Sequence, residues 1–250
     1  MLEADIVLGT LVSGSGDLFP IMGHPPANTS DISLAQFIAF VEEGIKGGGK
    51  RKGVKLDFKT TEVFKASLPM NFPVMLNADI LQGPIESKRT PVDADAFLYA
   101  CRTIFPDATL SVGWTSLYGS DEGAENPNDV PEDLTFYNSD NVMDMMDALR
   151  RNSVNQTLTF PVRAGIAARS LRDLPALLEQ QGSSFTLWSA KDDPVDVEDL
   201  KKLIEIVGKR RVYIDVPDSL RKQLTSSGRP LLGSASMALL AVIASMVLLR

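Results

Sequence analysis

The sequence predicts an α/β fold: a β/α barrel of the TIM type that lacks its first strand and helix and carries an apolar C-terminal tail. Three observations predict it. The chain has 250 residues, a length that suits one α/β barrel. Segments typical of strands alternate with segments typical of helices, which indicates βαβ units with parallel pairing. Polar residues gather near the C-terminal ends of several predicted strands, where barrels build their active sites.

The predicted elements follow one another in a regular order. Strands are expected at 2–8, 54–59, 73–79, 108–114, 156–163, 184–189 and 211–216, and helices at 33–45, 61–67, 93–104, 139–150, 168–180 and 196–207. Asp93 and Asp196 stand where they can cap a helix start, and Gly208 can end the last helix. Seven strands are one fewer than a closed barrel has. Either a strand and a helix before Met1 are absent, or the sheet is open.

Three loop segments and one cysteine complete the body. The insertion 9–26 is rich in Gly, Ser and Pro, and the insertion 119–133 is acidic and is interpreted most simply as a surface loop. The glycine-rich segment 47–53 precedes a strand rather than a helix, so we interpret it as a solvated turn and not as a phosphate loop. Cys101 falls in an apolar helical run and is expected to be buried.

Composition separates a body, residues 1–224, from a spacer and hydrophobic segment at 225–250. The net charge of −7 argues against nucleic acid as the main partner, and one cysteine allows no disulfide within the chain. From 230 to 249 no residue is charged. This tail is compatible with a glycolipid-anchor signal, a membrane span or a buried terminal helix, and the first two predict membrane attachment. No signal peptide precedes the first strand.

Acidic and basic side chains share faces on the first two predicted strands. Glu3 and Asp5 lie two residues apart on one strand, and Asp57 and Lys59 lie two apart on the next, so each pair points to one side. The only histidine, His24, lies in the loop between them. Three carboxylates that converge are suited to Mg²⁺ or Ca²⁺, which prefer oxygen ligands. We therefore predict Glu3, Asp5 and Asp57 as metal ligands. An imidazole can donate or accept a proton, so His24 is the candidate for proton transfer.

Later strands extend the polar face. The residues predicted to line the same mouth are Asp79, Arg163, Trp188 and Asp215. Five acids at one mouth repel one another, and Lys59, Arg163 and a bound cation would offset that repulsion. One histidine and one cysteine make a zinc site unfavourable. The alternative is that these acids form internal salt bridges and helix caps.

Several segments together resemble the menorin family, whose members are animal proteins. They are Glu-Ala-Asp at 3–5, Pro-Ile-Met-Gly-His-Pro-Pro at 20–26, Val-Lys-Leu-Asp-Phe-Lys at 54–59, Leu-Asn-Ala-Asp-Ile-Leu-Gln-Gly-Pro at 76–84, Leu-Ser-Val-Gly-Trp-Thr at 110–115, Leu-Thr-Phe-Pro-Val-Arg at 158–163 and Leu-Trp-Ser-Ala with Asp-Pro at 187–194. The resemblance covers residues 1–220.

That family is similar in turn to the glycerophosphodiesterases and the spider-venom sphingomyelinase D proteins, which are β/α barrels. The resemblance implies Glu3, Asp5 and Asp57 as metal ligands, His24 as general acid and Lys59 as a cation that contacts phosphate. The match of Trp188 to a residue at the mouth is weak. Those relatives use a second histidine on their first strand, and this chain has one histidine in all.

The functional expectation is a phosphodiesterase-like, divalent-metal-binding protein, outside the cell or attached to its surface, whose ligand is a phosphodiester or a phospholipid-like molecule. Two sequons, at Asn28 and Asn155, are consistent with the secretory route. The main alternative is a non-catalytic adhesion or signalling domain with a protein partner at the cell surface, which retains an ancestral pocket. A cytosolic binding protein would need the tail to be buried and both sequons to be unused.

Overall fold

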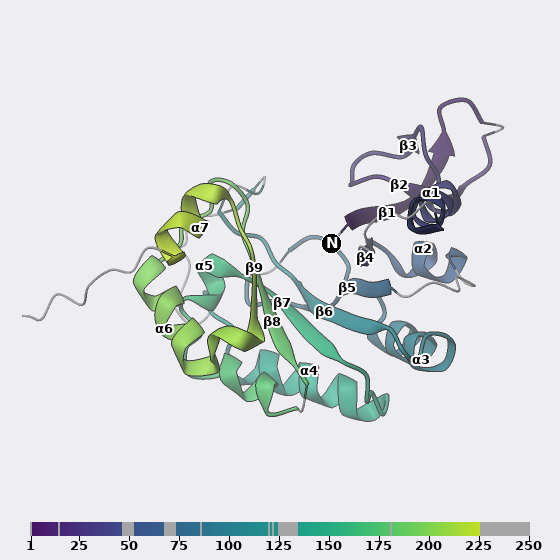
Figure 1. The fold of residues 1–250 in the computed structure, drawn as a ribbon. Coiled ribbons are helices and arrows are strands. Elements are labelled where there is room, and N and C mark those ends of the chain that lie inside the picture. Colours follow the sequence, from purple (N-terminus) through teal and green to yellow (C-terminus); the bar gives the residue numbers. More distant parts are fainter. Residues whose placement is uncertain are drawn as a thin grey trace, which may run out of the picture. The chain divides into compact units, whose positions relative to one another are not determined.

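Parallel strands form a sheet that curls into part of a barrel, with helices along its outer side (Figure 1). A computed structural model of the chain describes residues 2–14, 16–46, 53–67, 74–85, 87–119, 121, 123–124, 135–180 and 182–225. The strands are β1 (Leu2–Leu11), β2 (Phe19–Met22), β3 (Thr29–Ser30), β4 (Val54–Phe58), β5 (Val74–Gln82), β6 (Thr109–Thr115), β7 (Leu158–Arg163), β8 (Ser184–Trp188) and β9 (Val212–Asp215).

The order along the sheet is β2-β1-β4-β5-β6-β7-β8-β9, and β3 pairs with the end of β1. All neighbours from β1 to β9 are parallel, whereas β2 runs antiparallel to β1. The predicted strands thus correspond to β1 and β4–β9, and their parallel pairing is confirmed. Within the described residues no strand joins β9 to β1, so the sheet is a partial barrel.

The helices are α1 (Leu34–Lys46), α2 (Thr61–Ala66), α3 (Ala94–Ile104), α4 (Ser139–Arg151), α5 (Ala164–Ala167), α6 (Val197–Val207) and α7 (Asp218–Thr225), with short 3-10 helices at η2 (Leu174–Glu179) and η3 (Lys209–Arg211). Side-chain caps fix several starts: Asp93 accepts from Ala96 N in α3, and Asp196 accepts from Asp199 N in α6. Both caps match the predicted starts. Gly208 ends α6 with φ of 88°, a left-handed value that favours glycine.

The predicted helix 168–180 is wrong. In its place the chain forms the single turn α5, a break, and then η2. Pro175 stands at the start of η2; it has no N–H to donate to an α-helix, and its ring disfavours a helical conformation at Leu174. The apolar residues whose spacing suggested a helix include the buried leucines of η2.

The insertion 9–26 contains more regular structure than its composition suggests. Strand β1 continues to Leu11, and β2 pairs with it from Ile6 to Gly9. Gly9 allows this because a Cβ there would collide with the backbone of Asn28 and with Ile21. The hairpin places the loop with His24 directly beside β1.

The core lies between the outer face of the sheet and the helices. Every second residue of the central strands is apolar and fully buried, as the period of a strand requires: Leu56, Leu76, Leu110, Phe160 and Phe185. Helices α2 and α3 contribute Phe64 and Phe97, whose rings lie 4.7 Å apart. Cys101 is buried in this layer, as predicted.

The chain divides by its internal contacts into two units, Met1–Pro217 and Asp218–Arg250. The first holds the sheet and helices α1–α6, and the described part of the second is α7. The apolar stretch predicted as an anchor, 230–249, lies outside the described residues. No helix in the part of the chain that the structure describes has the length and apolar character needed to span a bilayer. Both sequon asparagines, Asn28 and Asn155, are exposed.

Candidate functional site at the C-terminal edge of the sheet

A row of polar residues crosses the inner face of the sheet from β1 to β8. Consecutive register pairs connect the row: Asp5 with Asp57, Asp57 with Asn77, Asn77 with Ser111, Ser111 with Thr159, and Thr159 with Ser184. The alternate residues of the same strands face the helices and are apolar. A parallel sheet packed on both sides is usually apolar on both faces, so this row indicates a surface for polar ligands.

Asp5 and Asp57 converge on one ammonium group. Lys59, which directly follows β4, places its Nζ 2.7 Å from Asp5 Oδ1 and 2.6 Å from Asp57 Oδ2. Register explains the convergence, since Asp5 and Asp57 are partners across β1 and β4 and Lys59 lies two residues beyond on the same face. The Lys59 and Asp57 side chains are 16% and 17% exposed.

Electrostatics favour the charged forms of this cluster. Burial by itself would raise the pKa of Asp57, but the charge of Lys59 and the hydrogen bonds from Lys59 and Asn77 hold that pKa below its ordinary value. Burial would likewise lower the pKa of Lys59, and the charges of Asp57 and Asp5 raise it above its ordinary value. Asp57 and Lys59 are therefore charged at neutral pH, and the cluster pairs two carboxyl groups with a single ammonium group.

Glu3 does not join this cluster. Its Oε1 lies 2.8 Å from Lys55 Nζ, and the two residues are register partners one step below Asp5 and Asp57. In the described part of the chain no group of three or more His, Cys, Asp or Glu side chains is arranged to hold a metal ion. The structure thus brings together two of the three predicted ligands, and the assignment of all three to a metal stays a prediction.

Asp79 lies on β5 beyond Asn77 and faces the same side. Burial, together with the negative charge of Asp57, raises the pKa of Asp79 to about 7. Its carboxylate receives no hydrogen bond from any described residue. Gly113 of β6 leaves the space that this carboxylate occupies, because a Cβ at 113 would lie 2.9 Å from Asp79 Oδ1 and 2.8 Å from Pro161 Cγ.

His24 is exposed in the loop after β2. The preceding residue, Gly23, donates its N–H to Asp5 O at 2.9 Å, which anchors the loop beside the strand that carries the acids. His24 Nδ1 lies 2.7 Å from Pro25 O. A carbonyl only accepts, so Nδ1 carries the hydrogen and Nε2 is the nitrogen left for proton exchange. Within the described residues no hydrogen bond or ion pair joins His24 to the acids or to Lys59.

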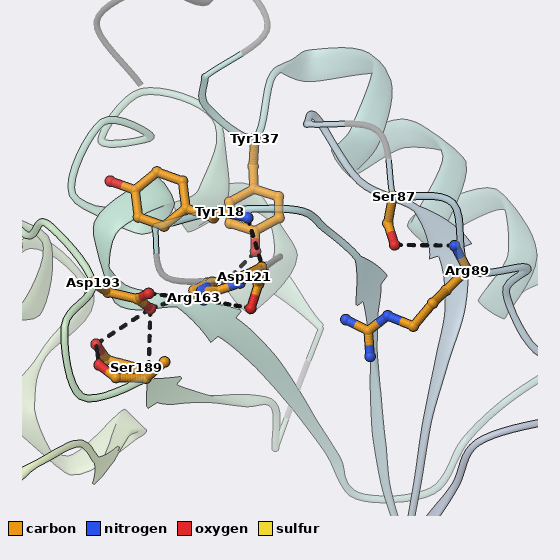
Figure 2. A network of polar contacts seen from close by, with 9 residues as sticks. Ser87, Arg89, Tyr118, Asp121, Tyr137, Arg163, Ser189 and Asp193 are labelled. Carbon is orange, nitrogen blue, oxygen red and sulfur yellow. Dashed lines mark hydrogen bonds and ion pairs between the residues drawn. The ribbon is translucent and has the colours of Figure 1, made fainter. Parts of the chain in front are cut away.

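Arg163 belongs to a second polar network, separate from Lys59 (Figure 2). Its Nε and Nη2 donate to Asp193 at 2.7 and 2.8 Å, and its guanidinium also pairs with Asp121. Tyr118 and Trp188 lie against it, with ring centroids 5.5 and 4.9 Å from the guanidinium carbon. Hydrogen bonds and charge from Asp193 and Asp121 raise the pKa of Arg163 even though burial would lower it.

Neither acidic partner of Arg163 was predicted from the sequence. Asp121 opens the insertion interpreted as a surface loop, and Asp193 lies in the Asp-Pro segment that contributed only to the family resemblance. A buried arginine requires carboxylates nearby. An arginine at the end of a predicted strand was therefore the signal that could have pointed to acidic residues in the neighbouring loops. Trp188 stacks on Arg163 rather than standing free, and Asp215, its register partner on β9, is exposed without a described ion pair.

Comparison with known proteins places this chain in a family. The Menorin N-terminal domain matches residues 1–221. The protein FAM151B of Homo sapiens is 34% identical over 225 residues, an alignment that covers 86% of this chain and 74% of that protein. No solved structure matches the chain. This chain, a partial β/α barrel with a polar row across the inner face of its sheet, is matched along nearly its whole body and is a member of the menorin family.

Proposed function

We propose that the Asp5–Asp57–Lys59 cluster binds a divalent cation, Mg²⁺ or Ca²⁺, together with a phosphodiester, so that the protein has a phosphodiesterase-like site on a TIM-type barrel. One observation carries this proposal. Carboxylate oxygens from two neighbouring strands lie 2.7 and 2.6 Å from a single point, the Lys59 ammonium. Backbone register holds the two carboxyl groups close together, and this arrangement favours binding of a cation with a higher charge than the lysine ammonium.

The donor set fits a hard cation. Ca²⁺ binds carboxylate oxygens at about 2.3–2.6 Å, and Mg²⁺ is commonly held by one or two carboxylates with water and substrate phosphate completing the shell. Asp5 and Asp57 supply such a pair, and Glu3 would have to leave Lys55 to add a third. The excess negative charge of the cluster also favours a divalent ion in place of the ammonium.

Each protein group then has a distinct role. Asp5 and Asp57 would hold the cation, and Lys59 would then be free to contact a phosphate oxygen. His24 presents Nε2 for proton transfer to a leaving oxygen, since its Nδ1 hydrogen is held by a backbone carbonyl. A bound divalent cation would supply Lewis-acid polarisation of the phosphoryl oxygens.

One feature of the chain favours a second function. It has a single histidine, whereas the phosphodiesterases that the family resembles use two. With Lys59 fully paired by Asp5 and Asp57 in addition, a non-catalytic adhesion or signalling domain that retains this pocket is the second candidate. The two functions differ in turnover, which an assay of phosphate ester release from glycerophosphocholine and lysophosphatidylcholine measures directly.

The first test is calorimetric titration of the whole chain with Mg²⁺ and with Ca²⁺, each compared in the presence of chelator. The proposal predicts saturable binding that Asp57→Asn weakens at least tenfold, because one of two charged ligands is lost. Asp95→Asn is the matched control: Asp95 is an exposed acid of α3, far in the chain from the cluster. Absence of binding, or equal weakening by both variants, would remove the basis of the proposal.

A further inference from the structure

The cations on the inner side of the parallel sheet and in the loops that follow its strands differ in how they are paired. Lys55 is bonded to Glu3, Lys59 to two aspartates and Arg163 to two aspartates. Arg89, in the loop after β5, is exposed, and its guanidinium makes no hydrogen bond or ion pair with any described residue. Its only described hydrogen bond is through the backbone, from Arg89 N to Ser87 Oγ at 3.1 Å. An incoming anion can therefore meet the Arg89 guanidinium without first displacing a described carboxylate.

The loop that carries Arg89 is tied to the ends of β5 and β6. Gln82 donates its side-chain amide to Ser87 O at 3.1 Å and accepts from Thr115 at 3.0 Å. Leu117 N donates to Ile85 O at 3.1 Å. These contacts tie Ile85 and Ser87, close before Arg89 in the chain, to the ends of both strands. A cation on an anchored loop loses less entropy on binding a ligand than one on an unattached loop.

Three residues after Arg89, the loop returns to β5 next to an acidic residue. Val92 N donates to Asp79 O at 2.8 Å, so the segment closes back onto β5 at the residue whose carboxylate faces the inner side. Figure 2 shows the Arg89 side chain extending from its loop over the strand ends, on the side of Asp121 and Arg163. Burial and Asp57 dominate the raised pKa of Asp79, and hydrogen bonds from Arg163 and Tyr118 oppose burial to hold the pKa of Asp121 low; the positive charge of Arg89 acts on both acids as a smaller influence that favours their charged forms. It lies near both acids and pairs with neither.

We propose that Arg89 is an anion-binding residue of this site and receives the phosphate group of the ligand. A guanidinium presents paired N–H donors that match two phosphate oxygens, which a lysine ammonium does not. Arg89 would hold the phosphate from the β5 side while Lys59 contacts it from the β4 side. This assignment rests on the proposed function for its ligand class and adds to it a residue that the sequence reasoning did not select.

The test uses inorganic phosphate as the probe and contains chelator, so its result does not depend on metal binding. Phosphate is titrated into the whole chain while NMR follows the arginine Nε–H resonances. We expect one Nε–H resonance, absent from Arg89→Gln, to shift with saturation. Arg89→Gln should weaken binding about tenfold and Arg89→Lys by less, because lysine keeps the charge and loses the paired donors.

Lys88→Gln is the matched control, since Lys88 is an exposed cation of the same loop and next to Arg89. It should leave phosphate affinity unchanged. The inference is overturned if wild type does not bind phosphate, if Arg89→Gln binds as wild type does, or if Lys88→Gln weakens binding as much. If the chain does not bind Mg²⁺ but Arg89→Gln still weakens phosphate binding, the result counts against the proposed function and leaves the assignment of Arg89 intact.

Discussion

Asp79→Asn should stabilise the protein above neutral pH. Asp79 is a carboxyl group on the inner face of β5 that receives no described hydrogen bond and lies near the charged Asp57. Asparagine has nearly the same shape and cannot ionise, so the substitution removes the charge while keeping the contact with Gly113. The effect must therefore come from the cost of charging this site.

The size of the effect follows from the pKa. Burial and Asp57 raise the pKa of Asp79 from 3.8 to about 7. The folded state thus keeps a proton that the unfolded chain has already lost, and wild-type stability falls as pH rises from 3.8 to 7. Each pKa unit corresponds to about 1.4 kcal/mol, which gives a ceiling of about 4 kcal/mol at pH 8. Because Asp79 is partly exposed, we expect about 2 kcal/mol at that pH.

Urea unfolding of both proteins, in chelator and across the range from about pH 4 to about pH 8, measures this difference. The two free energies of unfolding should be similar near pH 4 and diverge progressively toward pH 8, with Asp79→Asn the more stable. A difference that stays constant over this range would show that Asp79 titrates normally and would refute the reasoning.

Two substitutions test the packing around the site, both by urea unfolding at neutral pH. Gly113→Ala should destabilise by about 1–3 kcal/mol because the new methyl group would press on Pro161; an unchanged midpoint would show that the strands yield freely. Arg163→Met should cost about 3–5 kcal/mol, since it leaves Asp193 buried without its cation. The control Arg172→Met alters a side chain that is 88% exposed and should change stability by less than about 0.5 kcal/mol.

The part of the site that follows from strand periodicity could be predicted from the sequence. Asp5, Asp57 and Lys59 were expected on shared faces of adjacent strands, and the structure brings them within hydrogen-bonding distance. The same reasoning predicted the parallel pairing of the strands from the alternation of strands and helices. Local rules of this kind need only the spacing of residues along the chain.

What depends on register and on loops could not be predicted in the same way. Glu3 and Asp5 share a face, but register sets Glu3 opposite Lys55, and this ion pair withdraws it from the predicted ligand set. Arg163 was expected to offset the acids near Lys59. It pairs instead with Asp121 and Asp193, which reach it from loops after β6 and β8. No periodicity in the sequence fixes where such loops return.

Under the proposed function, Asp5 and Asp57 hold a divalent cation at the position now taken by the Lys59 ammonium. Crystals grown with Mn²⁺ in place of Mg²⁺ test it most directly, because anomalous scattering locates the ion. We predict one peak within about 2.5 Å of an oxygen from each aspartate, with Lys59 turned away from them. A map with no peak between the two carboxylates, and Lys59 still bridging them at saturating Mn²⁺, would contradict the account.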